Sequence, residues 1–180
     1  MVVSMLFVDV RGSTTIAENM NAAEFSRLMN RFYEATINFL VKADAFIDKL
    51  VEDEVTALFI PGYAGKEHAR RAVEAGQALL RVTGHGEPDS PWVPVGVGIH
   101  TGTAWVGSIA GASGAASDFT APGDNVNIAV RLASKAGQGE VLISEATYNA
   151  AQIKTEGLEM RELELKGKSE MVTVMVLHAE

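Results

Sequence analysis

The sequence contains no cysteine, and it is poor in aromatic and basic side chains. The absence of cysteine excludes disulfide bonds and thiolate metal sites, and it suits a reducing compartment. Lysine and arginine together number 15, against 23 aspartate and glutamate residues, which gives a formal net charge of −8. No basic patch offsets this negative charge, so we predict that the chain does not bind nucleic acid.

Long hydrophobic runs are also missing. The opening run from Met1 to Val8 is too short to cross a membrane, and it lacks the basic start of a signal peptide. We therefore expect a cytoplasmic protein with no membrane contact in this segment. Hydrophobic residues make up 47% of the 180 positions, which is enough for a core, and we expect one globular domain over residues 1–180.

Three adjacent carboxylates, Glu52, Asp53 and Glu54, stand between two mostly hydrophobic segments. These segments, 45–51 and 55–60, have the residue types of strands, so we predict a hairpin with an acidic tip. Carboxylates this close repel one another unless solvent or a cation takes up the charge. The tip is therefore either a solvated turn, which is the commoner case for such turns, or a cation site.

A second carboxylate occupies a matching place near the start of the chain. The hydrophobic run from Met5 to Val8 predicts a buried strand that ends at Asp9, just before Arg11-Gly12-Ser13-Thr14. A hard divalent cation takes oxygen ligands, usually one or two carboxylates together with substrate phosphates. Asp9 and Asp53 on neighbouring strand ends would suit such a cation.

Periodicity predicts the elements that follow. Residues 15–18 and residues 21–24 both have capping-box spacing, and the second box opens a long helix whose hydrophobic stripe runs from Phe25 to Leu40. The other predicted elements are a helix at 66–82, strands at 93–100 and 103–109, and a turn at 101–102 between them.

This order of elements predicts an α+β fold. As far as residue 100 it reads strand, helix, strand, strand, helix, strand, which is the ferredoxin-like βαββαβ core with both helices on one face of a palm-like antiparallel sheet. In that topology the first and third strands are central neighbours, so Asp9 lies beside the hairpin that carries Asp53. The same fold hosts phosphoryl-transfer enzymes and many proteins that are not enzymes, so it does not settle the function.

The segment 118–132 carries a further polar pattern. Pro122-Gly123 breaks the chain, Asp124 can cap a helix, and that helix places Asn127 and Arg131 four residues apart on one face. A guanidinium and an amide that project together can hold a phosphate and a sugar hydroxyl. A plain solvent-facing helix has the same spacing, and the pattern alone does not separate the two.

The rest of the chain predicts a C-terminal α/β extension. It consists of a strand at 140–143, a short helix capped by Ser144, and two closing strands at 160–165 and 172–177. The turn between the closing strands contains Lys166 and a second lysine, which is usual for a surface turn.

Four motifs in order resemble those of one family. They are Phe7-Val-Asp-Val-Arg-Gly-Ser-Thr14, Lys49-Leu-Val-Glu-Asp53, Gly98-Ile-His-Thr-Gly102 and Gly123-Asp-Asn-Val-Asn-Ile-Ala-Val-Arg131. Together they resemble the catalytic domain of the class III nucleotide cyclases, the adenylate and guanylate cyclases. Each motif alone is a weak signal, but all four in this order and at family-like spacing, over nearly the whole chain, form a specific one.

The resemblance implies a two-metal reaction. Asp9, Asp53 and the backbone carbonyl of Val10 would bind two divalent ions, Mg²⁺ or Mn²⁺, which hold a nucleoside triphosphate and lower the pKa of its ribose 3′-hydroxyl. The hydroxyl then attacks the α-phosphate in line, pyrophosphate leaves, and a 3′,5′-cyclic nucleotide remains. The amides of Gly12-Ser13-Thr14 would cradle phosphate oxygens at a helix start, and Lys166 would contact the terminal phosphates.

The same resemblance assigns the other substrate contacts. Arg131 would neutralise charge that develops on the α-phosphate, Asn127 would orient the ribose, and Lys49 would contact the base. Thr120 stands where many adenylate cyclases have a base-reading aspartate, and a bacterial subgroup has threonine there. Because a hydroxyl can donate or accept a hydrogen bond, ATP is the expected substrate, and GTP stays open.

The resemblance also implies a second copy of the chain as partner, and this sequence departs from the family pattern at one further position. The active sites of the family lie at the interface of a head-to-tail dimer, where one chain supplies the metal aspartates and the other the base, ribose and transition-state residues. This chain carries both sets, so a homodimer would hold two complete sites and a single chain would be inactive. Glu52 stands where the family usually has glycine. If that turn needs a positive φ, glutamate costs roughly 1 kcal/mol or more, and its carboxylate could compete for metal or recruit it.

Three functions stay open at this point. The first is an ATP cyclase, and the second is a catalytically silent cyclase-like domain that binds nucleotide or a partner, which Glu52 favours. The third is another phosphoryl-transfer enzyme on the same palm, such as a diguanylate cyclase or polymerase-like domain. A Gly-Gly-Asp/Glu-Glu-Phe hairpin tip would be expected of a diguanylate cyclase, whereas residues 51–55 read Val-Glu-Asp-Glu-Val.

Overall fold

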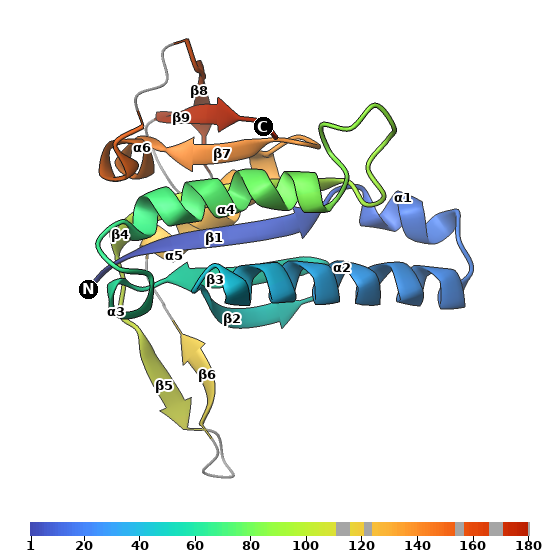
Figure 1. The fold of residues 1–180 in the computed structure, drawn as a ribbon, viewed down its shortest axis with the longest axis horizontal. Helices are drawn as coiled ribbons and strands as arrows, with labels where there is room; N and C mark the ends of the chain where they lie inside the picture. Colours follow the sequence, from blue (N-terminus) through green and yellow to red (C-terminus); the bar gives the residue numbers. More distant parts are fainter. Residues whose placement is uncertain (111–115, 121–123, 154–156, 166–170, 180) are drawn as a thin grey trace.

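The computed structural model describes residues 1–110, 116–120, 124–153, 157–165 and 171–179; at positions 49, 107–110 and 116–120 only the backbone is described. A sheet of seven strands runs in the order β2-β3-β1-β4-β7-β9-β8. Its strands are β1 (Val2–Val10), β2 (Phe46–Val51), β3 (Glu54–Phe59), β4 (Val95–Thr103), β7 (Val141–Ser144), β8 (Glu159–Glu164) and β9 (Met171–Leu177). Neighbouring strands are antiparallel except β4 and β7, which are parallel. A separate hairpin of β5 (Gly107–Ala110) and β6 (Ala116–Thr120) extends away from this sheet (Figure 1).

Helices cover both faces of the sheet. One face carries α2 (Ala22–Lys42), α4 (His68–Val82) and α6 (Glu145–Ala151), and the other carries α5 (Asp124–Lys135) (Figure 1). The short helices α1 (Ser13–Glu18) and α3 (Pro61–Ala64) lie at the ends of strands. The central strand β1 separates two cores, because Leu6 and Val8 pack with the α2 and α4 side while Met5 and Phe7 pack with the α5 side.

The predicted α+β core is confirmed. The order β1-α2-β2-β3-α4-β4 is the βαββαβ arrangement, and β1 lies between β3 and β4 as that topology requires. The predicted C-terminal extension is confirmed too, since β7, α6, β8 and β9 follow and their strands continue the same sheet. Ser144 caps α6 as predicted, because its side chain accepts a hydrogen bond from the Thr147 amide.

One of the two predicted capping boxes is correct. Asn21 caps α2: its Oδ1 accepts a hydrogen bond from the Glu24 amide at 2.8 Å, and its Nδ2 donates to the Glu24 carboxylate at 3.0 Å. The prediction for Thr15 is wrong, because α1 already begins at Ser13 and Thr15 lies inside it. Gly12 precedes α1 with a φ of 67°, a left-handed conformation that glycine adopts without strain, and it ends β1 there.

The predicted turn at residues 101–102 is wrong. Strand β4 continues to Thr103, because it pairs with β1 from Val2 opposite Thr103 to Val10 opposite Val95. Pairing with a full-length neighbour thus outweighs the local turn signal of Thr101-Gly102. The predicted strand at 103–109 is accordingly shorter, as β5, and β6 was not predicted.

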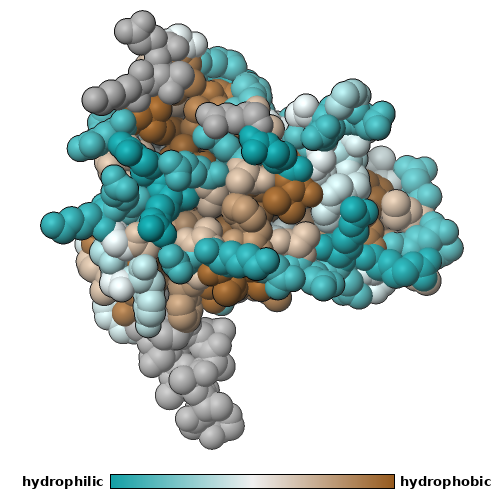
Figure 2. Space-filling model, viewed as in Figure 1, coloured by the Kyte–Doolittle hydropathy of each residue, from teal (hydrophilic) through white to brown (hydrophobic). Residues whose placement is uncertain are grey.

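The predicted helix at 66–82 begins two residues later, at His68, after the separate helix α3. Its inward-facing residues Ala69, Ala72, Val73, Leu79 and Leu80 are buried as predicted. Within the described part of the chain, no helix combines the length and hydrophobicity that a membrane span needs. Figure 2 shows hydrophilic side chains along the outer parts of the face that carries α2 and α4, and hydrophobic ones toward its middle.

Candidate functional site

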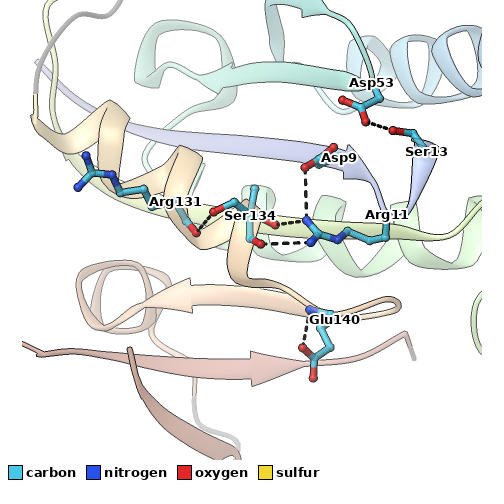
Figure 3. A network of polar contacts seen from close by, with 9 residues as sticks. Asp9, Arg11, Ser13, Asp53, Arg131, Ser134 and Glu140 are labelled. Atoms are coloured by element: carbon cyan, nitrogen blue, oxygen red, sulfur yellow. Dashed lines mark hydrogen bonds and ion pairs between the residues drawn. The ribbon is translucent and has the colours of Figure 1, made fainter. Parts of the chain in front are cut away.

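The two predicted metal aspartates lie side by side at the ends of neighbouring strands (Figure 3). Asp9 stands opposite Glu54 in the antiparallel pairing of β1 with β3, and the Val10 amide donates a hydrogen bond to the Asp53 carbonyl at 3.0 Å. Side chains that face each other across an antiparallel pair project from the same face of the sheet. Asp9 and Glu54 therefore project together from the face that carries α5, next to Asp53.

Electrostatics at this point favour the uptake of a cation or a proton. Burial raises the pKa of Asp9 to about 6, the neighbouring Asp53 carboxylate adds to the rise, and Arg11 opposes it. Burial likewise raises the pKa of Glu54 to about 7, with the charges of Asp9 and Asp53 as further causes. Closely spaced carboxylates of this kind hold excess negative charge at neutral pH, which a divalent cation relieves. The donor set, made of carboxylate and backbone oxygens, fits a hard divalent ion.

The start of α1 lies directly beside Asp53. The Ser13 hydroxyl donates a hydrogen bond to Oδ2 of Asp53 at 2.5 Å, which ties the predicted phosphate loop to this predicted metal ligand. Gly12 and Thr14 are exposed, and within the described residues no side chain caps α1. The backbone amides of its first turn are thus available to an anion.

Arg11, which the sequence analysis did not assign, joins the acidic site to α5. Its guanidinium lies 3.4 Å from Oδ2 of Asp9 and donates hydrogen bonds to the carbonyls of Ala133 at 3.3 Å and Ser134 at 3.2 Å (Figure 3). A cation at the C-terminal end of a helix is stabilised by the carbonyls that have no partner in the helix. The position of Arg11, two residues after the predicted metal ligand Asp9, was the available signal for this contact.

Glu52 has the positive φ that was expected to cost free energy for a residue other than glycine. Its φ is 52°, which lies in the left-handed region that favours glycine. The side chain therefore adds both backbone strain and a third negative charge next to Asp53. A cavity of about 410 Å³ opens on the α2 side of this tip and is lined in part by Ser13, Tyr33 and Glu52. Burial, together with the charges of Asp53 and Glu52, raises the pKa of Tyr33 there.

Asn127 and Arg131 lie one turn apart on α5, as predicted. Asn127 is exposed and Arg131 is half-buried. In Figure 3 the Arg131 side chain points away from Asp9 and Asp53. One chain thus brings the two aspartates together and holds Arg131 apart from them.

Three predicted contacts fall wholly or partly outside the described residues. Lys166 lies outside them altogether. The backbones of Lys49 and Thr120 belong to β2 and β6, and their side chains are not described. Their assigned contacts with phosphate and base therefore stay predictions.

A second group of potential metal ligands is explained by an ion pair. Glu140, Glu159 and His178 bring ligand atoms within 4.8 Å of one another. Arg161, however, donates two hydrogen bonds to the Glu140 carboxylate, at 2.9 and 2.6 Å, and one to Glu159 at 2.8 Å. Chiefly through these hydrogen bonds, Arg161 lowers the pKa of Glu140. The guanidinium takes the place that a cation would occupy.

Sequence reasoning also missed the partners of the motif that contains His100. The ring of His100 bonds to Ser144 and Asn125. Asn125 follows Asp124, which was expected to cap the helix and instead lies in its first turn. The polar residues His100 and Asn125 stand in two separate sequence motifs. Their hydrogen bond could not be predicted from these motifs, because it depends on how α5 crosses β4.

Comparison with known proteins agrees with this geometry. The family model described as the adenylate and guanylate cyclase catalytic domain matches residues 1–178. An adenylate cyclase of Anabaena cylindrica is 30% identical over 187 residues, a match that covers 98% of this chain and 36% of that protein. The chain therefore spans about a third of the length of this relative.

Solved structures of cyclases have the same fold. The crystal structure of the guanylyl cyclase Cya2 has a TM-score of 0.85 and 27% identity, and the match covers 100% of this chain and 93% of that one. The adenylyl cyclase CyaB from P. aeruginosa has a TM-score of 0.80 and 29% identity, with 99% and 95% covered. Because the family model matches nearly the whole length of this chain, the chain belongs to the adenylate and guanylate cyclase catalytic domain family.

Proposed function

We propose that two copies of this chain form an enzyme that converts ATP to 3′,5′-cyclic AMP and pyrophosphate. The observation that carries the proposal is the separation of two sets of residues in one chain. Asp9 and Asp53 meet at the ends of β1 and β3, whereas Arg131 points away from them (Figure 3). A head-to-tail homodimer joins the acidic set of one chain to Asn127 and Arg131 of the other.

The acidic set binds the metal and the phosphates. Asp9, Asp53 and the Val10 carbonyl would hold two ions, Mg²⁺ or Mn²⁺, and such ions, when bound, make the ribose 3′-hydroxyl more acidic. The carboxylate pair suits them because its own charges repel. The amides of Gly12-Ser13-Thr14 at the start of α1 would bind triphosphate oxygens, as helix starts commonly do. Lys166 would contact the terminal phosphates.

The second set acts on the reacting groups. Asn127 would hold the ribose so that its 3′-oxygen faces the α-phosphorus. The 3′-hydroxyl gives up its proton to solvent as the new bond forms between these atoms and the bond to pyrophosphate breaks. Arg131 would neutralise the charge that builds on the α-phosphate oxygens. Loss of such a donor typically costs about 10²-fold in rate, so we expect about that loss in Arg131→Ala.

One relative and one residue assigned by resemblance support ATP over GTP. The Anabaena relative at 30% identity is an adenylate cyclase. By its resemblance to the threonine-type bacterial subgroup, Thr120 would read the base, and Lys49 would contact the base beside it. Because the Cya2 neighbour is a guanylyl cyclase, GTP is the alternative substrate to test.

The test is a direct assay of product. Purified protein is incubated with ATP or GTP and Mn²⁺ at rising protein concentration, and cyclic nucleotide is measured by mass spectrometry. We expect cyclic AMP, formed at a rate that rises faster than linearly with protein because the dimer is the active form. Asp53→Ala, with the same fold and no second metal aspartate, is the matched control and should form none. Cyclic GMP alone, or no product from either nucleotide, would contradict the proposal.

A catalytically silent domain is the second candidate, and Glu52 is the observation that favours it. Its positive φ and its carboxylate alter the turn that holds Asp53. Nucleotide binding without turnover, restored to turnover in Glu52→Gly, would support this candidate.

A further inference from the structure

A row of buried polar side chains crosses the sheet behind the site. Hydrogen bonds connect six of them without a break, in the order Ser4, Thr101, Thr147, Ser144, His100 and Asn125. The first five are at most 6% exposed. At one end Ser4 bonds to His68 of α4 at 2.9 Å, and at the other end Asn125 belongs to α5, the helix of Asn127 and Arg131.

The hydrogen bonds fix the orientation of the two residues at the α5 end. Asn125 lies with one side-chain atom 2.7 Å from the Thr103 carbonyl, which can only accept, so that atom is the amide nitrogen. Its Oδ1 therefore faces His100 Nε2 at 2.8 Å, and Nε2 must carry the proton that it donates. In the neutral ring, Nδ1 then accepts from the Ser144 hydroxyl at 2.7 Å.

The packing around this bond leaves α5 little freedom. A Cβ at Gly102 would lie 2.6 to 2.8 Å from the side-chain atoms of Asn125, so the amide fills the space that only glycine leaves. A Cβ at Gly98 would overlap the backbone of α5 at Ala133 and would lie 2.8 Å from the Ala129 carbonyl. At the far end, Arg11 holds the last carbonyls of the helix, as described above. The helix is thus held at its start by His100, in its middle by glycine contacts and at its end by Arg11.

We propose that His100 is a positioning residue for the reaction, acting through Asn125. Asn127 and Arg131 follow Asn125 by two and six positions on the same short helix, so the hydrogen bond that fixes its first turn also fixes their direction. A fully bonded buried network specifies one arrangement of its elements, which loose hydrophobic packing does not. The kinetic part of this inference rests on the proposed cyclase function, whereas the fixing of α5 does not.

Two variants of His100 separate the two hydrogen bonds. In His100→Gln the amide nitrogen reaches the place of Nε2 and keeps a donor for Asn125. In His100→Asn the shorter side chain keeps a partner for Ser144 and loses the bond to Asn125. We expect His100→Asn to lower kcat about ten- to hundredfold with KM changed less than about threefold, because substrate groups are misplaced and not lost. His100→Gln should retain most of kcat.

A double-mutant cycle tests whether the effect passes through α5. If His100 acts by orienting Arg131, then His100→Asn should lower kcat much less in an Arg131→Ala background than in the wild type. The same cycle is run with Asn127→Ala, because Asn125 orients both residues. Multiplied effects in both backgrounds would show that His100 acts independently of Arg131 and Asn127, and would overturn the proposal.

Structural readouts decide the proposal even in the absence of turnover. Hydrogen exchange at the amides of residues 125–131 should be faster in His100→Asn than in the wild type, and close to the wild-type rate in His100→Gln. The ¹⁵N chemical shifts of the wild-type ring should identify the neutral form with its proton on Nε2. If the wild type makes no cyclic nucleotide, the proposed function fails, and these two measurements still test the fixing of α5. Equal exchange in all three proteins, or equal losses of kcat and melting temperature in both variants, would overturn the proposal.

Discussion

At the scale of single residues, the site is dominated by carboxylates that the fold holds closer together than their charges favour. Asp9 and Glu54 face each other across two strands, and burial raises the pKa of both. Glu52 adds a further charge from a left-handed backbone conformation. The strands can hold this arrangement because hydrophobic residues on either side are buried, and a cation would relieve it.

Replacement of Glu52 by glycine should stabilise the chain. Relief of the positive φ contributes about 1 to 2 kcal/mol, and the extra freedom of glycine in the unfolded chain removes about 0.4 to 1 kcal/mol of that gain. A net gain near 1 kcal/mol would raise the melting temperature by about 2 to 4 °C. Thermal unfolding followed by circular dichroism measures this. Glu52→Gln is the matched control, because it removes the charge and keeps the strained backbone; an equal rise in that variant would show that charge, and not φ, is the cause.

The stability of the metal-free chain should depend on Glu54 in a defined direction. Burial, with the charges of Asp9 and Asp53 as further causes, raises its pKa from 4.5 to about 7 in the folded chain. Between these values the folded state therefore binds more protons than the unfolded chain. The stability that this proton contributes is complete below about pH 4.5 and is lost as pH rises through about 7. Glu54→Gln should therefore melt above the wild type at about pH 8, and this advantage should shrink toward about pH 5.

The comparison with Glu54→Gln is necessary because other groups titrate in the same range. Burial lowers the pKa of His68 and His85, so their contribution to stability rises with pH and opposes that of Glu54. A difference in melting temperature between the wild type and Glu54→Gln that does not change with pH would refute the assignment of this pH dependence to Glu54.

Addition of Mg²⁺ or Mn²⁺ at about pH 8 should raise the melting temperature of the wild type, because an ion at the predicted site binds only the folded chain.

At the scale of elements, the sequence predicted correctly those features that depend on residues close together in the chain, such as the cap of α2. Asn21 caps α2 because its own side chain reaches the Glu24 amide, and the hydrophobic stripe of that helix needs no other information. Thr15 has the same spacing to Glu18 but lies inside α1, since the turn at Gly12 sets the start of that helix. The length of β4 depends on pairing with β1, and the bond between His100 and Asn125 depends on how α5 crosses β4. Such distant contacts leave no pattern in one stretch of sequence.

The close packing of α5 against β4 at Gly98 gives a prediction at this scale. Gly98→Ala would force a methyl group against the backbone of α5 at Ala133, which can move only if the whole helix moves. Overpacking of this kind typically costs about 1 to 3 kcal/mol, and we expect a loss in the upper part of that range. Chemical denaturation measures it. Gly62→Ala is the matched control, because a Cβ there meets nothing within 4 Å. Similar stability of the two variants would contradict the close contact.

At the scale of the whole molecule, one chain holds two sets of residues that do not meet. The strand ends with Asp9 and Asp53 and the helix with Arg131 belong to different parts of the fold, and Arg131 points away from the aspartates (Figure 3). In a head-to-tail pair each chain would use both sets, one in each of two sites. Mixing of two differently inactivated chains tests this arrangement directly.

Asp53→Ala and Arg131→Ala should each have little or no activity alone, and their mixture should regain part of it. Random pairing makes about half of the dimers mixed, and each mixed dimer joins the intact Asp53 of one chain to the intact Arg131 of the other in one of its two sites. The expected activity is about a quarter of that of the wild type at the same total protein concentration, provided that the chains exchange. A mixture of Asp53→Ala with the double variant Asp53→Ala/Arg131→Ala is the matched control and should stay inactive, since neither chain supplies Asp53. If the first mixture is no more active than its components while native mass spectrometry, which resolves the two variants by mass, shows mixed dimers, the head-to-tail arrangement would be refuted.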